Sequence, residues 1–199
     1  MGFPIQDDAI VKRCLAVRDG WADGNKVRRM AQLCRDAKCC VEVGVWAGKS
    51  LLAMALATKG DVYGIDPWDT AASVSGWDNT DNGVWWSSVD HEEIYKKCRA
   101  LMSDLSHVKL LRMTSADASP SFADDMVDIV HIDGNHADDI ALSDVVAWTP
   151  KIKKGGFLIL DDIDWPSTKP AQQWLLDNGW KQVEEYHTWA VYKFIVHTN

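Results

Sequence analysis

The chain has 199 residues, of which 47% are hydrophobic and 25% charged, and its formal net charge is −8. This size and balance predict one globular domain with a hydrophobic core. The negative charge does not suit a nucleic-acid binder, whose affinity comes largely from neutralised phosphates, and no apolar stretch approaches the ~18 residues of a membrane span. Neither nucleic acid nor a membrane is an expected partner.

The cysteines and the first residues of the chain bear on the cellular compartment. The five cysteines are odd in number and contain no C-x-x-C pair, which favours reduced thiols over a disulfide framework or a zinc site. The segment MGFPIQDD at the start lacks the basic and apolar regions of a secretory signal peptide. We therefore expect a cytoplasmic protein.

The first part of the chain predicts two helices followed by a strand, a helix and a second strand. Apolar residues recur at helical spacing in the two N-terminal segments, whereas the later strands are short apolar runs that end near glycine or proline. The predicted elements are helices over residues 5–19 and 24–37, a strand over 39–44, a helix over 49–58 and a strand over 61–66.

Residues 69–89 fit neither the helical nor the strand period and hold Trp77, Trp85 and Trp86. A loop of this length in a compact domain is usually functional or mobile. We expect a Trp-rich insertion here, and three roles stay open for it: a cover over a bound substrate, a contact in a homodimer, or ordinary packing.

The second part of the chain predicts a further alternation of helices and strands. The predicted elements are a helix over 90–105, strands over 108–113 and 127–133, a helix over 138–148, a strand over 157–161, a helix over 170–178 and strands over 181–185 and 190–196. Such alternation is typical of a parallel sheet covered on both faces, and the short link between the last two strands suits an antiparallel pair.

We therefore predict the α/β class and a Rossmann-like architecture. The expected sheet is mostly parallel, with helices on both faces and one antiparallel edge strand. We expect a single domain over residues 1–199, made of N-terminal helices over 1–37 and a core over 38–199 that carries the insertion at 69–89.

The turn EVGVWAGKS over residues 42–50 ends the first strand and opens a helix. A dinucleotide fingerprint needs glycine where the chain has Trp46, and a P-loop needs glycine where it has Val43, although GKS matches the end of a P-loop. A carboxylate beside the turn would repel phosphates but attract the cationic groups of S-adenosylmethionine. The candidate contacts for this cofactor are Glu42, Gly44, Gly48 and Ser50.

Two further segments extend the candidate cofactor site. Asp66 ends the second strand, about 20 residues after the turn, where an acidic residue can accept both ribose hydroxyls; the alternative is a turn-initiating Asp-Pro pair. Trp68 could stack on adenine or pack in the core. Ala116 and Asp117 follow the third strand, where this fold contacts the adenine edge, and the alternative for Asp117 is a helix cap.

Carboxylates follow the next two strands of the predicted sheet. Asp133 ends the strand over 127–133, and Asp161 and Asp162 end the strand over 157–161. If these strands are neighbours, the three carboxylates meet at one edge, since paired strands lie ~5 Å apart. Such carboxylates repel one another unless one is protonated or a cation lies among them, and oxygen ligands suit Mg²⁺, Ca²⁺ or Mn²⁺.

These motifs together resemble the methyltransferase 24 family of class I, S-adenosylmethionine-dependent O-methyltransferases. The resemblance covers residues 38–170 and rests on VDIVHIDGNH followed by GGFLILDD, with the glycine turn and Asp66 before them. It implies S-adenosylmethionine as methyl donor and a small-molecule hydroxyl as acceptor. It also implies a divalent cation, Mg²⁺ or Mn²⁺, held by Asp133, Asp161 and Asp162, with Asp133 contacting the cofactor as well.

One residue departs from the family pattern, because many relatives carry Asp where this chain has Asn135. If that acid is the base in some relatives, this chain must use another group. His136 is then the candidate base, since imidazole titrates near neutral pH; the alternative is that it caps the helix beginning near Asp138. We take His136 and Asp133 as candidate catalytic residues and His131 as a buried polar neighbour.

The expected function is methyl transfer from S-adenosylmethionine to a hydroxyl with help from a divalent cation. Three alternatives stay open: a metal-independent methyltransferase, a non-catalytic S-adenosylmethionine-binding module and, less favoured, a P-loop-like NTPase. The acceptor is expected to be a small molecule.

Overall fold

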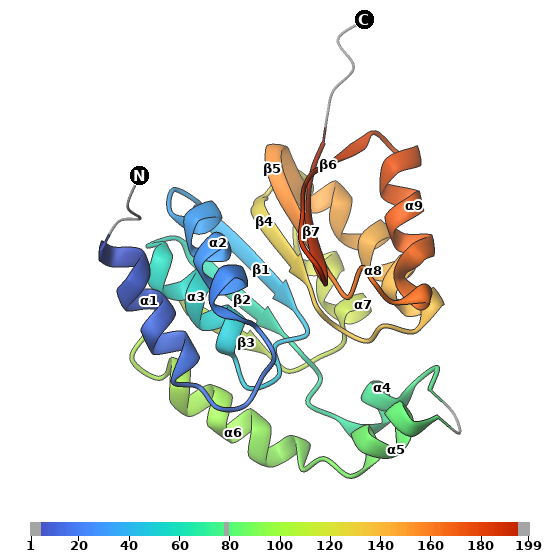
Figure 1. Ribbon diagram of the computed structural model, residues 1–199, viewed down its shortest axis with the longest axis horizontal. Helices are drawn as coiled ribbons and strands as arrows, with labels where there is room; N and C mark the ends of the chain where they lie inside the picture. Colours follow the sequence, from blue (N-terminus) through green and yellow to red (C-terminus); the bar gives the residue numbers. More distant parts are fainter. Residues whose placement is uncertain (1–4, 78–79, 195–199) are drawn as a thin grey trace, which may run out of the picture.

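Helices and strands alternate along the chain in the computed structural model, which describes residues 5–77 and 80–194 (Figure 1). The strands are β1 Cys39–Val43, β2 Asp61–Ile65, β3 Val108–Leu111, β4 Val127–Ile132, β5 Ile152–Asp161, β6 Trp180–Glu185 and β7 Trp189–Phe194. The helices are α1 Ile5–Leu15, α2 Gly24–Cys34, α3 Lys49–Ala57, α4 Thr70–Val74, α5 Asp81–Ser87, α6 His91–Met102, α7 Ser115–Ala118, α8 Asp138–Trp148 and α9 Lys169–Asp177, with short 3₁₀ turns at Ser119–Ser121, Thr149–Lys151 and Pro166–Thr168.

The strands form one seven-stranded sheet in the order β3-β2-β1-β4-β5-β7-β6. Strands β1 to β5 are parallel, so their carboxyl ends meet at one edge of the sheet. Strand β7 runs antiparallel to both β5 and β6, as the short link between β6 and β7 requires. The predicted Rossmann-like fold, a mostly parallel sheet with an antiparallel edge, is confirmed.

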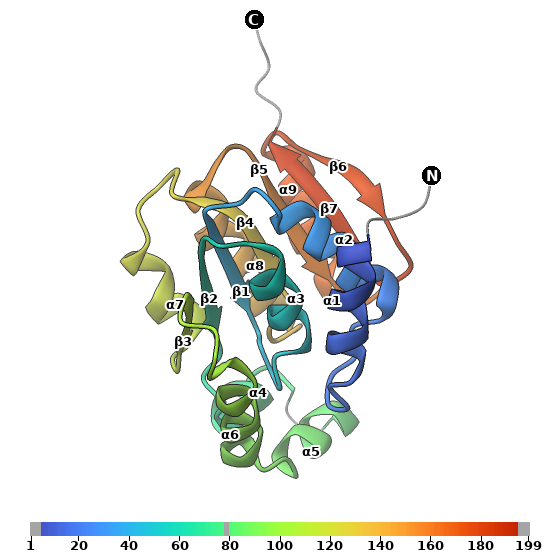
Figure 2. The ribbon, with the colours of Figure 1, turned by 90° about the vertical axis from the view of Figure 1, so that its left-hand side faces the viewer.

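Two helix layers cover the faces of the sheet (Figures 1 and 2), and the side chains of β1 alternate between them. Cys40 of β1 packs in the layer of α1, α2, α3 and α6, whereas Val41 packs in the layer of α7, α8 and α9. Successive strand residues point to opposite faces. Glu42, two residues after Cys40, therefore points into the layer of α1 to α3 and is fully buried.

The segment predicted as a loop over residues 69–89 contains two short helices, α4 and α5, so that prediction is wrong. Each helix begins at a side-chain cap: Asp69 accepts a hydrogen bond from the amide of Ala72, and Thr80 accepts one from the amide of Gly83. Helices of 5 and 7 residues are too short to show a 3.6-residue period in the sequence. Figure 1 shows both extending away from the sheet.

Other differences lie at element ends. Strand β5 begins at Ile152 rather than 157, because Gly155, with a φ of 85°, is accommodated beside an irregularity in the β4–β5 register. The predicted residues 195–196 of the last strand lie outside the described residues. No helix within the described ranges is long and apolar enough to span a bilayer. All five cysteines are buried, and none of them forms a disulfide.

Candidate functional site

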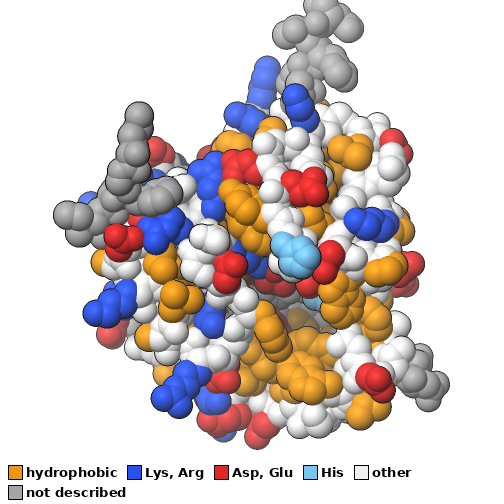
Figure 3. All heavy atoms as spheres, in the orientation of Figure 1, with side chains coloured by type: hydrophobic (Ala, Val, Ile, Leu, Met, Phe, Trp, Pro, Cys, Tyr) orange, Lys and Arg blue, Asp and Glu red, His pale blue; other side chains and the backbone are white. Residues whose placement is uncertain are grey.

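A cavity of about 920 Å³ lies at the carboxyl ends of β1, β2, β4 and β5. Ligand pockets in proteins have volumes of ~300–1,000 Å³, and this edge is where open α/β sheets bind ligands. Figure 3 shows a hollow on this face, with hydrophobic side chains gathered below it and acidic side chains above. Seven of the 11 tryptophans line the cavity: Trp21, Trp46, Trp77, Trp85, Trp86, Trp165 and Trp189.

The glycine turn forms one wall of the cavity. Gly44 lines it with a φ of 81°, and a Cβ at this position would overlap the backbone of Asp133 and Gly134. Gly48, with a φ of 87°, faces Met102 of α6 instead and does not line the cavity. Both glycines are needed for backbone conformation and close packing, and only Gly44 lies where a ligand could touch it.

Asp66 holds the glycine turn in place. One carboxylate oxygen accepts hydrogen bonds from the amides of Val45 (3.0 Å) and Trp46 (2.9 Å), and the other accepts one from the amide of Trp68 (2.7 Å). Burial raises the pKa of Asp66, although these three amides act against that rise. The side chain also lines the cavity, so the carboxylate that fixes the turn is within reach of a ligand.

The other predicted cofactor contacts divide into two groups. Ser50 and Ala116 line the cavity. Trp68 is almost fully buried, donates from Nε1 to the carbonyl of Trp46 (2.9 Å) and packs on Tyr95. The Asp117 carboxylate accepts from the hydroxyl of Thr114, and the two residues close the first turn of α7. Of the described residues, Glu42, Gly48, Trp68 and Asp117 are predicted contacts that the structure does not place at the cavity.

Glu42 pairs with His131 in the interior instead. Glu42 Oε1 lies 2.7 Å from His131 Nδ1, and both side chains are fully buried. The Nε2 atom of His131 lies 3.7 Å from Oδ2 of Asp133. Within the described residues, Glu42 Oε2 and His131 Nε2 have no hydrogen-bond partner. The pair connects the buried helix layer to the carboxylate at the end of β4.

Lys26 of α2 lies among the carboxylates, and sequence reasoning missed it. Its Nζ is 3.1 Å from Asp133 Oδ2 and donates to Asp161 Oδ2. Burial alone would lower the pKa of Lys26, but Asp133 and Asp161 raise it above its ordinary value, so the ammonium stays charged. The sequence did hold one indication of its position. Lys26 lies four residues before Met30 and therefore on the same, buried face of the helix.

The pKa values of the two carboxylates beside Lys26 are shifted in opposite directions. Burial raises the pKa of Asp161, but the charge of Lys26 and hydrogen bonds to Lys26 and Asp133 outweigh burial and bring it to about 2. Burial, followed by the negative charge of Asp161, raises the pKa of Asp133. The ammonium is therefore paired primarily with an ionised Asp161.

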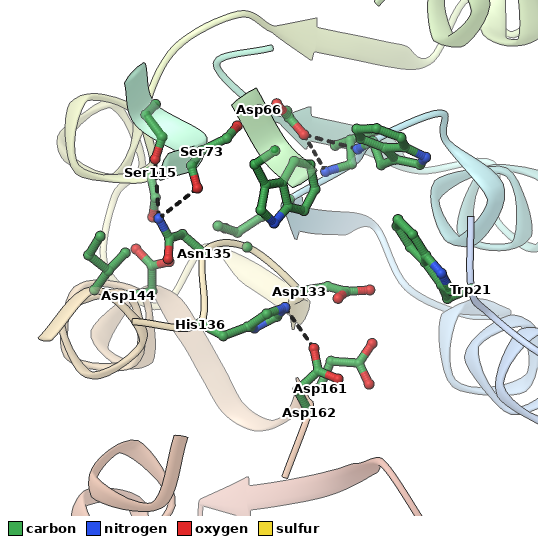
Figure 4. A pocket seen from close by; sticks show the side chains of 18 of the residues that line it. Trp21, Asp66, Ser73, Ser115, Asp133, Asn135, His136, Asp144, Asp161 and Asp162 are labelled. Atoms are coloured by element: carbon green, nitrogen blue, oxygen red, sulfur yellow. Dashed lines mark hydrogen bonds and ion pairs between the residues drawn. The ribbon is translucent and has the colours of Figure 1, made fainter. Parts of the chain in front are cut away.

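His136 and Asp162 form a second side-chain pair at the same edge. His136 Nε2 lies 2.7 Å from Asp162 Oδ2, and the His136 ring packs against Trp165. Strand β5 ends at Asp161, and Asp162 has a φ of 50°, so the chain turns and both consecutive aspartates face the cavity. The cap of α8 is Ala137, which leaves the His136 side chain pointing into the site (Figure 4).

Asn135 ties the Trp-rich segment to the loop after β4. Its Oδ1 accepts from Trp77 Nε1 (2.9 Å), and its Nδ2 donates to the carbonyls of Ala72 (3.1 Å) and Ser75 (2.8 Å). A carboxylate has no N–H to donate to these carbonyls. The departure from the family pattern at this position therefore has a structural consequence that the sequence alone did not reveal.

Four tryptophans form an aromatic wall of the cavity. Trp21, Trp46, Trp85 and Trp86 lie with neighbouring ring centroids 4.8–5.8 Å apart. They come from four places in the chain: the link before α2, the glycine turn and two positions of α5. Trp21 is 72% exposed and Trp85 is 43% exposed, so this wall presents open apolar surface to the cavity mouth.

The carboxylates and histidines make two groups that could hold a metal ion among the residues the structure describes. One group is His131, Asp133 and Asp161, and the other is Asp133, His136 and Asp162, with ligand atoms within 4.8 Å of one another in each. The predicted ligands Asp161 and Asp162 fall in different groups. Asp133 belongs to both, and Figure 4 shows it on the same side of the cavity as Asp161, Asp162 and His136.

Comparison with known proteins agrees with this geometry. Comparison with curated proteins gave no significant sequence match. Among solved structures, the O-methyltransferase NovP superposes with a TM-score of 0.72 at 17% identity, over 94% of this chain and 97% of that one. The O-methyltransferase TomG from Streptomyces achromogenes, in complex with SAM, superposes with a TM-score of 0.65 at 13% identity, over 97% and 91%.

A third structure is an O-methyltransferase from Bacillus cereus in complex with SAH, with a TM-score of 0.60 at 12% identity, over 96% of this chain and 91% of that one. At these identities the likeness shows the fold. The sequence itself matches the methyltransferase-domain family over residues 41–163, more than half of the chain. With its glycine turn and the acidic ends of β2, β4 and β5 at one cavity, the chain belongs to the methyltransferase-domain family.

Proposed function

We propose that this chain transfers the methyl group of S-adenosylmethionine to a hydroxyl of a small molecule. The observation that carries the proposal is the arrangement of one cavity: the turn fixed by Asp66 forms one wall, and the His136–Asp162 pair stands at another. The turn supplies a place for the cofactor, and the pair supplies a proton acceptor. SAM or SAH in two of the structural neighbours supports the choice of cofactor.

The cofactor side is assigned from the residues that reach the cavity. Gly44, Ser50 and Ala116 would lie against S-adenosylmethionine, and Asp66 would accept from the ribose hydroxyls. A carboxylate offers about four acceptor sites, so Asp66 keeps capacity beyond its three backbone bonds. The P-loop alternative is less favoured, because Lys49 donates to the carbonyl of Gly20 (2.6 Å) instead of standing free for a phosphate.

The reaction needs a base for the acceptor's proton. As the hydroxyl oxygen attacks the methyl carbon, the bond from that carbon to sulfur breaks, the sulfonium becomes a neutral thioether and the hydroxyl proton must leave. With the Nε2 proton of His136 directed at Asp162, the lone pair of Nδ1 would accept the hydroxyl proton. Asp162 then stabilises the imidazolium. Positioning of the acceptor in line with the methyl supplies much of the rate.

The acceptor side is assigned to the aromatic wall. Trp85 and Trp86 of α5, with Trp77 before it, line the cavity, which favours the cover role among the three that the sequence left open. Wide apolar rings of this kind suit the flat face of a ring-bearing small molecule. No contact in this arrangement calls for a nucleic acid, and we propose a soluble small-molecule acceptor.

The divalent cation implied by the family resemblance fits the described residues poorly. Lys26 already occupies the space between Asp133 and Asp161, and both carboxylates use their Oδ2 atoms to bind it. Asp162 is engaged by His136. We therefore route no step of the mechanism through a metal ion. The His136–Asp162 pair disfavours the alternative of a non-catalytic S-adenosylmethionine-binding module, because cofactor binding alone does not require a proton acceptor.

The proposal is tested by binding and by turnover. Calorimetry should show S-adenosylhomocysteine binding to the wild-type chain, and a panel of phenols and sugars should reveal an acceptor that releases S-adenosylhomocysteine. His136→Gln should keep cofactor binding and lower turnover by ~10²–10⁴-fold, the usual contribution of general-base catalysis. Absence of any cofactor binding would rule out the proposed function, and equal turnover by the variant would remove His136 as the base.

A further inference from the structure

The ammonium of Lys26 is shared by carboxylates at two adjacent strand ends. Its Nζ lies 3.1 Å from Oδ2 of Asp133, after β4, and donates to Oδ2 of Asp161, at the end of β5. The Lys26 side chain is 5% exposed. Burying an ammonium is costly unless its partners compensate for the lost water. The two carboxylates therefore hold Lys26 in place, and Lys26 allows both to lie at the same edge.

The start of α2 delivers this ammonium in a fixed position. Asp23 caps the helix by accepting a hydrogen bond from the backbone amide of Lys26 (2.8 Å). Val27, the next residue, and Met30, one turn on, are fully buried in the helix layer. The backbone of Lys26 is thus anchored on both sides, and its side chain spans from α2 to the sheet edge.

A divalent cation at this point would compete with Lys26 for the same two carboxylates. Such a cation binds carboxylate oxygens at ~2.0–2.6 Å, whereas Oδ2 of Asp133 and Oδ2 of Asp161 already accept from Lys26. The cation would also repel the nearby ammonium, with little solvent between them to screen the repulsion. The ammonium and a metal ion therefore exclude each other between these two strand ends.

We propose that Lys26 is a built-in cation that takes the place of the divalent metal ion at this edge. It neutralises Asp161, fixes the positions of Asp133 and Asp161 beside the cavity, and makes methyl transfer by this chain independent of added metal. The inference rests on the proposed methyltransferase function but not on the identity of the acceptor. Lys26 is a positioning residue, because it acts through the two carboxylates, and His136 keeps the role of base.

The test measures Mn²⁺ binding by electron paramagnetic resonance, together with melting temperature in Mg²⁺ and in EDTA. Four forms of the full chain are compared: wild type, Lys26→Ala, Lys26→Arg and Lys153→Ala. Lys153 is the matched control, since it pairs with Asp128 (2.9 Å) across the same two strands but at their opposite ends. Calorimetry with S-adenosylhomocysteine is run on every sample.

Wild type, Lys26→Arg and Lys153→Ala should bind no Mn²⁺ tightly, and their melting temperatures should be the same in Mg²⁺ and EDTA. Lys26→Ala should gain about one Mn²⁺ per chain, with at least about tenfold higher affinity, because a like charge is removed from between two carboxylates. Mg²⁺ should then raise its melting temperature. Adding Asp133→Asn to Lys26→Ala should abolish the acquired binding.

Two results would overturn the proposal. One is tight Mn²⁺ binding by the wild-type chain, which would place a metal at Asp133, His136 and Asp162 with Lys26 still in position. The other is a folded Lys26→Ala chain that gains no Mn²⁺. If that variant does not fold, wild type and Lys26→Arg still decide the question. Absent S-adenosylhomocysteine binding would contradict the proposed function separately, without altering what the Mn²⁺ measurements say about Lys26.

Discussion

Two walls of the same cavity are held by different kinds of interaction. At the ends of β1 and β2, backbone amides of the glycine turn and of Trp68 donate to the carboxylate of Asp66. At the ends of β4 and β5, side chains pair with side chains, Lys26 with two aspartates and His136 with Asp162. The first wall fixes a backbone shape, and the second fixes a set of charges.

This difference affects how each wall can change. A wall made of backbone amides tolerates many side chains, provided that the glycine and the accepting carboxylate stay. A wall made of charge pairs changes its chemistry when one residue changes, because a buried charge without its partner is costly. The wall fixed by Asp66, where we propose that the cofactor binds, therefore tolerates substitution of its other side chains, whereas the charged wall changes its chemistry with a single residue.

The largest effect is expected where the two walls touch. Gly44→Val adds a side chain at a φ of 81° that overlaps the backbone of Asp133, and we expect destabilisation by about 4 kcal/mol or more, the range of severe core changes. Urea unfolding measures it. Gly155→Ala is the matched control: its φ is 85°, but nothing lies within 4 Å of the added Cβ, so only the left-handed backbone cost of about 1–2 kcal/mol applies. Equal losses in both variants would show that close contact between the walls is unimportant.

The next effect concerns Asp144 of α8, which lines the cavity. Burial raises the pKa of Asp144 to about 6 from 3.8, against the opposing hydrogen bond from Ser115 and the charge of His136. Between these two values the unfolded chain loses the proton while the folded chain keeps it, so folded stability falls as pH rises. Above pH 6 the loss is complete, at most about 3 kcal/mol.

Asp144→Asn removes this titration. Its stability relative to wild type should therefore improve from pH 4 to pH 6 and stay level above that, as measured by urea unfolding at each pH. Asp8→Asn serves as control, because Asp8 is an exposed partner of Arg28 (2.6 Å). A difference between Asp144→Asn and wild type that does not change with pH would mean that Asp144 titrates normally.

A smaller effect is expected from weakening the wall fixed by Asp66 with a side chain of similar size. Asp66→Asn leaves one acceptor oxygen and an NH₂ group to face three backbone amides, which should cost about 2 kcal/mol. Calorimetry should show weaker binding of S-adenosylhomocysteine by about tenfold or more. Asp69→Asn, which keeps an acceptor for the amide of Ala72, should bind as wild type does. Unchanged affinity in Asp66→Asn would remove Asp66 from the cofactor site.

The contrast between the walls also explains what the sequence could predict. The sheet, the turn over 42–50 and the cavity-facing positions of Asp133, Asp161 and Asp162 follow from local patterns and strand order. Lys26 does not, because it lies 107 residues from Asp133 in the sequence and reaches it only through helix packing. Glu42 was misplaced because its strand face, rather than its place before the glycine, decides where the carboxylate points. The choice between adenine stacking and core packing for Trp68 depends on its burial, which no local sequence pattern predicts.

The smallest effect tests what joins the Trp-rich segment to the charged wall. Asn135→Asp keeps an acceptor for Trp77 but loses the N–H groups that bind the carbonyls of Ala72 and Ser75. Losing these bonds should lower the free energy of local opening of the segment by about 1–1.5 kcal/mol. Where opening limits access of the protease, this corresponds to roughly tenfold faster cleavage by chymotrypsin within residues 80–89. Asn178→Asp removes a similar bond, to the carbonyl of Trp174 at the end of α9, and should leave this cleavage unchanged. If Asn135→Asp is cleaved no faster than Asn178→Asp, the segment is held by its aromatic packing alone. The proposed cover over the acceptor would then depend on the aromatic wall rather than on the loop that carries His136.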